Sequence, residues 1–220
     1  MKRLVVAAVL AGALTVGPSP EAPAASHGSK VHPGGTVMVG DSTTYRVAGL
    51  LRTEAPDWYL DYHWGRSIKA LPQHIKSYLR RDPNPTNFVM ALGTNWCHNP
   101  EWSAARLRRA IGLLPAHTNV FLVMVVRAGR FQADKDQILK LYNRYSRDLA
   151  KTRPHTYIID WRGAVLADPT LDPVTGTSSL LEDGTHQTGS PHGDKPGPGA
   201  QVYVDLVIDR WSQVNGAPPA

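Results

Sequence analysis

The sequence predicts a three-layer α/β/α sandwich built around a five-stranded, mostly parallel sheet. Short apolar runs alternate along the chain with segments of helical period, as they do in βαβ units. Several of the apolar runs are continuous, which is typical of parallel strands that are buried on both faces. The 220 residues suit one domain of this kind. Right-handed crossovers would then place helices on both sides of the sheet.

Five strands are expected, separated by segments long enough to hold crossover helices. They are Thr36–Val39, Trp58–Tyr62, Asn87–Leu92, Asn119–Val126 and Thr156–Ile159. We assign residues 36–215 to a single domain, followed by a short frayed tail.

Three helices are expected from apolar residues at the spacing i, i+3, i+4, i+7, and we expect these stripes to pack in the core. The stripes are Leu107, Ala110, Ile111 and Leu114; Ile138, Leu141, Tyr142, Tyr145 and Leu149; and Val204, Val207, Ile208 and Trp211. The tripeptide Asn99-Pro100-Glu101 predicts the start of the first of these helices, because proline is tolerated in the first turn.

The N-terminus has the features of a secretory signal peptide. Lys2 and Arg3 form a positive region, an apolar stretch runs from Leu4 to Val16, and Ala22-Pro23-Ala24 offers a cleavage site. The apolar stretch is shorter than the ~20 residues of a membrane span, so no stable membrane insertion is expected after cleavage. We therefore expect a signal peptide over 1–24, a short leader over 25–35, and a secreted protein outside a bacterial cell, in solution or at the cell wall.

Composition and charge narrow the classes of partner. Hydrophobic residues make up 42% of the chain and charged residues 19%, which excludes a disordered polyelectrolyte. The net charge of +6 includes Arg106, Arg108 and Arg109 on one predicted helix. A solvated helix face is the interpretation we prefer, and attraction to an anionic polymer is the alternative. No nucleic-acid motif is present, so no nucleic-acid partner is expected, and we expect a monomer.

Cys97 is the single cysteine of the chain, so the fold has no intramolecular disulfide. We expect it to be a small buried residue, with a reactive thiol or an intermolecular partner as the alternatives.

Three polar blocks lie where strands end or near the C-terminus. Gly40-Asp41-Ser42-Thr43 follows the first strand, Gly93-Thr94-Asn95 follows the third, and Asp183-Gly184-Thr185-His186 lies in a loop rich in Gly, Pro and Ser. Ser42 alone would be read as a helix N-cap and Asn95 as an Asx-turn residue. A serine nucleophile, however, needs a base and an oxyanion site. Because ligands bind at the carboxyl ends of parallel strands, these blocks can converge, and we favour a catalytic role.

The blocks resemble those of the SGNH/GDSL hydrolase family, and the resemblance spans nearly all of the chain beyond the leader. The family markers fall on Ser42, Gly65, Asn95 and His186, with Asp183 as the acid. The resemblance implies a flavodoxin-like α/β/α fold and a serine ester hydrolase that works through an acyl-enzyme. Ser42 would attack the ester, His186 would move the proton and Asp183 would orient the imidazole. The oxyanion hole would consist of the backbone N–H groups of Ser42 and Gly65 and the side-chain amide of Asn95, and no cofactor is implied.

The family often has Asp after the asparagine, whereas Trp96 follows Asn95 here. Trp64 and Trp96 flank the expected oxyanion residues and are candidates for a substrate platform under a sugar ring or an acyl chain. The expected substrates are small-molecule, glycan or lipid esters, with an O-acyl ester on a glycan preferred. An O-acyltransferase that acts on a carbohydrate hydroxyl and an inactive glycan-binding domain are the alternatives.

A metal site is the remaining alternative for the C-terminal loop, which holds Asp183, His186, His192 and Asp194. Zinc sites use His and Asp ligands, but this spacing matches no standard metal motif. We therefore expect no metal.

Overall fold

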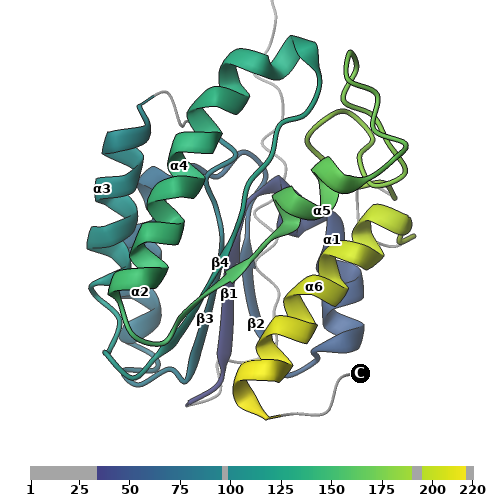
Figure 1. Ribbon diagram of the computed structural model, residues 1–220. Coiled ribbons are helices and arrows are strands. Elements are labelled where there is room, and N and C mark those ends of the chain that lie inside the picture. Colours follow the sequence, from purple (N-terminus) through teal and green to yellow (C-terminus); the bar gives the residue numbers. More distant parts are fainter. Residues whose placement is uncertain (1–33, 96–98, 190–194, 217–220) are drawn as a thin grey trace, which may run out of the picture.

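The computed structural model describes residues 34–95, 99–189 and 195–216 of the chain (Figure 1). The predicted signal peptide and all but the last two residues of the predicted leader lie outside the described residues.

A five-stranded parallel sheet forms the centre of the molecule. The strands are β1 (Thr36–Gly40), β2 (Tyr59–Tyr62), β3 (Asn87–Ala91), β4 (Asn119–Val123) and β5 (Thr156–Ile159). They follow the order β2-β1-β3-β4-β5, and all four strand pairings are parallel. Every residue of β1 and β3 is buried, which explains their continuous apolar sequences. The predicted fold class is confirmed, and each strand lies where the sequence predicted it: β5 has the predicted bounds, and the other strands differ at one end by one to three residues.

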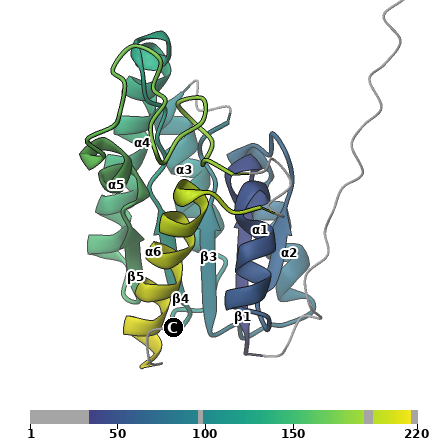
Figure 2. The same ribbon diagram turned by 90° about the vertical axis from the view of Figure 1, so that its right-hand side faces the viewer.

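Helices cover both faces of this sheet (Figures 1 and 2). They are α1 (Ser42–Glu54), α2 (Leu71–Leu79), α3 (Pro100–Ile111), α4 (Ala133–Thr152), α5 (Trp161–Ala167) and α6 (Pro198–Asn215), with short 3₁₀ turns η1 (Ile68–Ala70) and η2 (Arg130–Gln132). One hydrophobic cluster packs α1, α5 and α6 against the sheet, and a second packs α2, α3 and α4 against its other face. The three layers are thus held together by two separate hydrophobic cores, one on each face of the sheet.

The predicted apolar stripe of α4 is wrong in part. Leu141 is 39% exposed, and the buried residues are Leu139, Tyr142, Asn143 and Ser146. The reason is a polar contact: the side chain of Asn143 accepts a hydrogen bond from Val125 N (3.0 Å) and donates one to Val125 O (2.7 Å). These bonds satisfy the backbone just beyond β4, so a polar residue occupies the core-facing position.

Helix α3 begins as predicted, with Asn99 as its N-cap accepting a hydrogen bond from Trp102 N (2.8 Å). Within the described residues, no helix combines the length and the apolar character that a membrane span requires.

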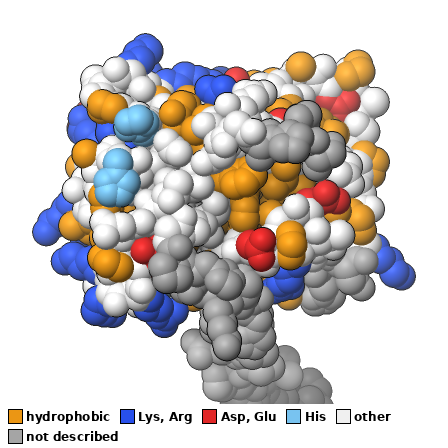
Figure 3. Space-filling model, turned by 90° about the horizontal axis from the view of Figure 1, so that it is seen from below, with side chains coloured by type: hydrophobic (Ala, Val, Ile, Leu, Met, Phe, Trp, Pro, Cys, Tyr) orange, Lys and Arg blue, Asp and Glu red, His pale blue; other side chains and the backbone are white. Residues whose placement is uncertain are grey.

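The two ends of the sheet differ in character. Seen from below, hydrophobic side chains gather around a hollow near the middle of the face, while most Lys and Arg side chains lie at its margin (Figure 3). A cavity of about 360 Å³ at this end is lined by Thr36, Asn87, Trp58 and Trp211, among others. The polar blocks singled out in the sequence lie at the opposite end, where the strands finish.

Candidate active site

Ser42 is the first residue of α1, directly after β1 and Asp41. Asp41, and not Ser42, caps the helix: its Oδ1 accepts hydrogen bonds from Thr43 N and Thr43 Oγ1, both at 2.9 Å. The capping alternative for Ser42 is therefore wrong, and its hydroxyl is free for another contact. Residue Ser42 is only 3% exposed, and its Oγ lies 2.9 Å from His186 Nε2.

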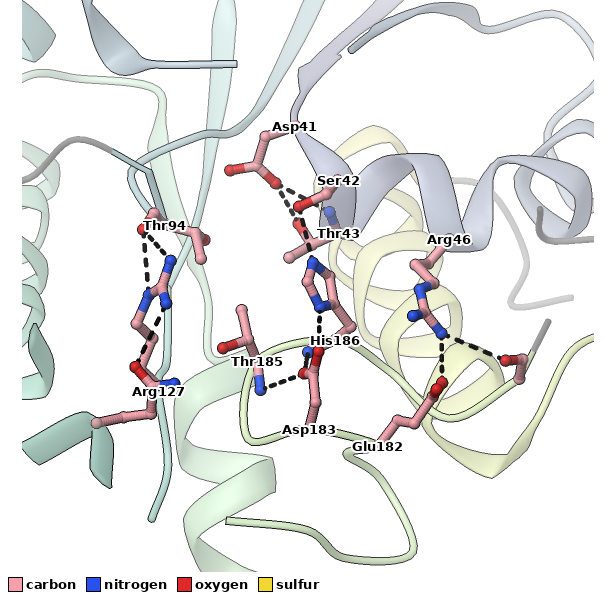
Figure 4. A network of polar contacts seen from close by, with 12 residues as sticks. Asp41, Ser42, Thr43, Arg46, Thr94, Arg127, Glu182, Asp183, Thr185 and His186 are labelled. Atoms are coloured by element: carbon pink, nitrogen blue, oxygen red, sulfur yellow. Dashed lines mark hydrogen bonds and ion pairs between the residues drawn. The ribbon is translucent and has the colours of Figure 1, made fainter. Parts of the chain in front are cut away.

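Asp183 completes a chain of side-chain contacts with Ser42 and His186 (Figure 4). Asp183 Oδ2 lies 2.7 Å from His186 Nδ1, on the side of the ring away from the serine. A neutral imidazole with its proton on Nδ1 donates to the carboxylate and accepts from the hydroxyl. The structure thus brings together three residues that lie up to 144 positions apart in the sequence.

A tight turn holds the aspartate and the histidine in this arrangement. Asp183 Oδ1 accepts hydrogen bonds from Thr185 N (3.0 Å) and His186 N (2.8 Å). Gly184 has a φ of +78°, and its carbonyl accepts a hydrogen bond from Ala128 N (2.7 Å). A Cβ at Gly184 would lie 2.6 Å from Ala128 O, so this close approach requires glycine.

Two carboxylates of the site have perturbed pKa values of opposite direction. Burial raises the pKa of Asp41 above its usual value, opposed in part by the Thr43 hydrogen bonds and by the charges of His186 and Arg127. Burial alone would also raise the pKa of Asp183, but hydrogen bonds from the His186 ring and from the His186 and Thr185 backbone hold that pKa well below its usual value. Asp183 is therefore ionised over the whole neutral range, as a partner for an imidazolium must be.

The candidate oxyanion groups lie around Ser42. Asn95 Nδ2 lies 3.3 Å from Asp41 Oδ2 and 3.4 Å from Arg66 O, so its amide sits between the serine block and the Gly65 loop. Gly65 has a φ of +69°, and a Cβ built there meets no atom of the described residues within 4 Å. The N–H of Ser42 belongs to the first turn of α1, where backbone donors have no partner within the helix.

The loop that carries Gly65 is held by charged groups that sequence patterns did not single out. Arg66 folds back so that NH2 lies 2.7 Å from Asp61 Oδ1 and NH1 donates to Asp61 O at 2.7 Å. His74 Nδ1 lies 2.9 Å from Asp61 Oδ2. Burial acts to raise the pKa of Asp61, but His74 and Arg66 outweigh it and lower that pKa. We call this group the Asp61–Arg66–His74 clamp.

Trp64 stacks on the imidazole of His186, with ring centroids 5.1 Å apart and an interplanar angle of 16°. Tyr45 packs edge-on against Trp64 at 5.8 Å and also against Tyr62 at 5.7 Å. Trp64 remains 48% exposed. The expected substrate platform therefore also contacts the histidine of the site, and Tyr45 is a support that the sequence did not reveal.

Arg127 lies on the Thr94 side of the site (Figure 4). Its NH2 and Nε donate to Thr94 O at 3.2 Å and 3.4 Å, and its NH1 donates to Gln132 Oε1 at 3.4 Å. Thr94 precedes Asn95, so this guanidinium braces the segment that carries the candidate oxyanion amide. No local motif marks Arg127; only the fact that it follows a predicted strand end could have pointed to it.

Trp96, Cys97, His192 and Asp194 lie outside the described residues. Among the residues that the structure does describe, no group of three or more His, Cys, Asp or Glu side chains could hold a metal ion.

Comparison with known proteins identifies the fold. No protein-family model matches the chain, and no curated protein matches its sequence. Among solved structures, the chain is similar to the C-terminal catalytic domain of Streptococcus pneumoniae peptidoglycan O-acetyltransferase A, solved with a methylsulfonyl adduct (TM-score 0.68, 21% identity, covering 84% of this chain and 97% of that one). It is also similar to a lipolytic protein of the G-D-S-L family from Veillonella parvula (TM-score 0.62, 10% identity, covering 81% and 98%). The chain has the G-D-S-L hydrolase fold.

A third similar structure with this fold is a carbohydrate esterase of family 3 from Talaromyces cellulolyticus (TM-score 0.59, 14% identity, covering 84% of this chain and 99% of that one). The G-D-S-L fold therefore extends over almost the whole length of each of these proteins. The resemblance first indicated by short motifs is confirmed at the level of the fold.

Proposed function

We propose that the protein is a serine ester hydrolase that uses Ser42, His186 and Asp183 as a catalytic triad. The single observation that carries this proposal is the continuous contact from Asp183 Oδ2 through the His186 ring to Ser42 Oγ, at 2.7 Å and 2.9 Å. The lipolytic protein and the carbohydrate esterase of the same fold support the reaction class.

In this reaction Ser42 Oγ attacks the carbonyl carbon of an ester while His186 Nε2 accepts the hydroxyl proton. The imidazolium that forms is stabilised by Asp183, whose low pKa keeps it ionised. Collapse of the tetrahedral intermediate transfers the proton to the departing alcohol and leaves an acyl-serine. A water molecule, activated by the same histidine, then releases the acid and restores the hydroxyl.

The oxyanion hole of the proposal consists of the backbone N–H groups of Ser42 and Gly65 and the amide of Asn95. The amide contacts of Asn95 are long, at 3.3 Å and 3.4 Å. A developing oxyanion is a stronger acceptor than the neutral Arg66 carbonyl, so one N–H of the amide can turn to it as charge develops. No cofactor takes part in any of these steps.

We further propose that the protein is secreted and that its substrates are O-acyl esters of a glycan or a lipid. The N-terminal sequence supports secretion. The carbohydrate esterase of the same fold supports a glycan ester.

The decisive experiment measures turnover of p-nitrophenyl acetate by the wild type and by Ser42→Ala. The variant should lose at least ~10⁴-fold in kcat, because the acyl-enzyme of the proposed mechanism forms on the Ser42 hydroxyl. Treatment of the wild type with a sulfonyl fluoride should add one adduct at Ser42 by peptide mass analysis. A variant that retains near wild-type kcat would refute the assignment.

Acyl transfer is the second candidate, and the similarity to the peptidoglycan O-acetyltransferase domain favours it. The same residues would serve, with a sugar hydroxyl in place of water. We expect hydrolysis to dominate. The test offers p-nitrophenyl acetate with an excess of oligosaccharide and compares free acetate with acetylated sugar by mass spectrometry. Acetylated sugar as the main product would make the protein a transferase.

A further inference from the structure

A second cavity, of about 260 Å³, opens beside the candidate active site. Its walls come from the segment after β4, the first turns of α4, the end of α5 and the following loop. The lining includes Arg127, Arg130, Lys140, Asp136, Leu166 and Pro173. We call it the Arg127–Lys140 cavity.

The polar side of this cavity carries an excess of positive charge. Three cationic side chains, from Arg127, Arg130 and Lys140, line it with one carboxylate, Asp136. That carboxylate is already engaged by Arg162, whose NH1 and NH2 reach both Asp136 oxygens, NH2 at 2.8 Å. Lys140 lies 3.6 Å from the same carboxylate, on the next turn of α4. One carboxylate shared by Arg162 and Lys140 leaves the cavity net positive.

Two of the cations make no hydrogen bond or ion pair with a carboxylate in the described part of the chain. The hydrogen bonds of the Arg127 side chain go to neutral oxygens of Thr94 and Gln132. Arg130 is exposed, and it is its backbone N–H, not its guanidinium, that bonds to Pro173 O (2.9 Å) and Val174 O (3.0 Å). An arginine that is not paired with a carboxylate of the protein is suited to bind one from a ligand.

Exposed apolar side chains lie in the cavity lining and next to it in the chain. Phe131 is 82% exposed, Leu166 51% and Val174 48%, which makes them three of the most exposed large hydrophobic residues described. Leu166 lines the cavity, Phe131 follows Arg130, and Val174 bonds to the Arg130 backbone. A sugar ring has apolar C–H faces and polar edges, so a cationic cavity with exposed apolar side chains beside it fits a sugar that bears a carboxylate.

The cavity is connected to the proposed catalytic residues by the backbone. Arg127 lines the cavity and also braces Thr94, which precedes Asn95. Ala128, another lining residue, donates its N–H to Gly184 O within the Asp183–His186 turn. A glycan that lies across these segments can present one sugar unit to the cavity and an ester to Ser42.

We propose that the Arg127–Lys140 cavity binds a carboxylate-bearing sugar unit, so that the ester cleaved at Ser42 belongs to an acidic glycan. The cleavage of that ester at Ser42 rests on the proposed function, but the binding of an acidic sugar in the cavity does not depend on it.

The test compares O-acetylated digalacturonate with O-acetylated digalactose, matched in linkage and in the position of the acetyl group. The wild type should prefer the acidic ester by about tenfold in kcat/KM at low salt. The preference should shrink in 0.5 M NaCl, because exposed charges are then screened. The double variant Arg130→Gln/Lys140→Gln should reduce the preference to about one, mainly through KM. Arg127 is left intact because it braces Thr94.

Arg108→Gln/Arg109→Gln is the matched control, because it likewise removes two exposed positive charges, here from α3, away from the cavity lining. It should leave the ratio of the two kcat/KM values unchanged. Unchanged melting temperatures would show that the variants are folded.

Direct binding separates this inference from the proposed function. Calorimetry of unacetylated digalacturonate with Ser42→Ala should detect binding that weakens about tenfold when Arg130→Gln/Lys140→Gln is added. If neither ester is cleaved but this binding behaves as expected, the cavity assignment holds and the hydrolase proposal fails. If both esters are cleaved equally and digalacturonate binding is absent or unchanged in the variants, the cavity assignment is overturned and the hydrolase proposal stands.

Discussion

At the scale of single residues, Asp41 is an unusual neighbour for the proposed nucleophile Ser42, because its carboxyl group is completely buried. Its oxygens accept from Thr43 N, Thr43 Oγ1 and Asn95 Nδ2. These contacts align the start of α1 and the candidate oxyanion amide at once. Burial nevertheless raises the pKa of Asp41, so the charged form costs stability in the folded state. The buried charge of Asp41 thus lowers the stability of the folded state, while its hydrogen bonds hold the start of α1 and the Asn95 amide in position.

The variant Asp41→Asn removes that buried charge. Because the folded pKa of Asp41 is raised, its contribution to stability is fully present below the unfolded value of about 3.9 and is lost as the pH rises through the folded value. The variant should therefore melt at a higher temperature than the wild type at pH 7, and this advantage should shrink as the pH falls toward 4. Calorimetry from pH 4 to 8 checks it; an advantage that grows toward low pH would contradict the assigned direction.

Trp64 is a second residue that contacts the candidate site, because its indole stacks on His186. Trp64→Leu should lower kcat by about three- to tenfold on p-nitrophenyl acetate, which is too small to use a sugar platform, since an aromatic pair contributes about 0.5–1.5 kcal/mol. Trp64→Phe should retain most of the activity, because it keeps a ring against the imidazole. A loss seen only with glycan esters, and only in KM, would show that Trp64 binds substrate and does not position His186.

At the scale of secondary-structure elements, the loop between β2 and α2 is fixed by its own charged residues. The Asp61–Arg66–His74 clamp joins the end of β2 to the loop and to α2 through contacts of 2.7 to 2.9 Å. The Arg66 and Asp61 side chains are only 9% and 17% exposed, so water weakens this contact little. The backbone of Gly65 is placed as a consequence.

Breaking the clamp with Asp61→Asn should release the loop and lower kcat by about tenfold, less than the 10²–10³ cost of losing an oxyanion donor outright. KM should change little, because the hydrogen bond from the Gly65 N–H to the oxyanion strengthens mainly in the transition state. The measurement is steady-state kinetics on p-nitrophenyl acetate. Asp57→Asn makes the same chemical change at an exposed residue before β2 and serves as the control. Equal kinetics for the two variants would show that the Asp61–Arg66–His74 clamp does not affect catalysis.

At the scale of the whole molecule, the candidate site depends on a contact between distant segments. Arg46 of α1 bonds to Glu182 and to Gly189 O (3.4 Å), across 136 and 143 positions of sequence (Figure 4). The Arg46 side chain is 8% exposed, whereas that of Glu182 is 52% exposed. Arg46 therefore ties the helix that begins with Ser42 to the loop that carries Asp183 and His186.

Arg46→Met should cost about 1–3 kcal/mol of stability, because it leaves two acceptors without their donor. Hydrogen exchange of peptides covering 178–189 should become faster, and kcat should fall as His186 loses its fixed position. Glu182→Gln should have a smaller effect, since that partner is half exposed. Unchanged exchange in Arg46→Met would show that the loop is held by other contacts.

The sequence by itself determined the sheet and the identity of the residues at its edge. Continuous apolar runs such as that of β3 are typical of a strand buried on both faces, and this signal lies within a few neighbouring residues. The Ser42 and Asp183–His186 blocks could also be recognised in the sequence. The first directly follows a predicted strand, and the second has Asp, Gly and His at the spacing of a local turn. Helices α1, α2 and α5 were not predicted. The first turn of α1 buries Ser42, Thr43 and Thr44, which are poor helix formers that the sheet edge and the Asp41 cap hold in place.

Only the tertiary structure decided which groups support the site. The stack of Trp64 on His186, the bracing of Thr94 by Arg127 and the bond from Arg46 to Glu182 join segments with no spacing rule between them. The same holds for Asn143, a polar residue that faces the core because the backbone of Val125 needs its amide. A pattern along the chain reports the preferences of neighbours in sequence. Contacts across the sheet are selected by the packing of layers and by the need of buried polar groups for partners, and these exist only once the chain has folded.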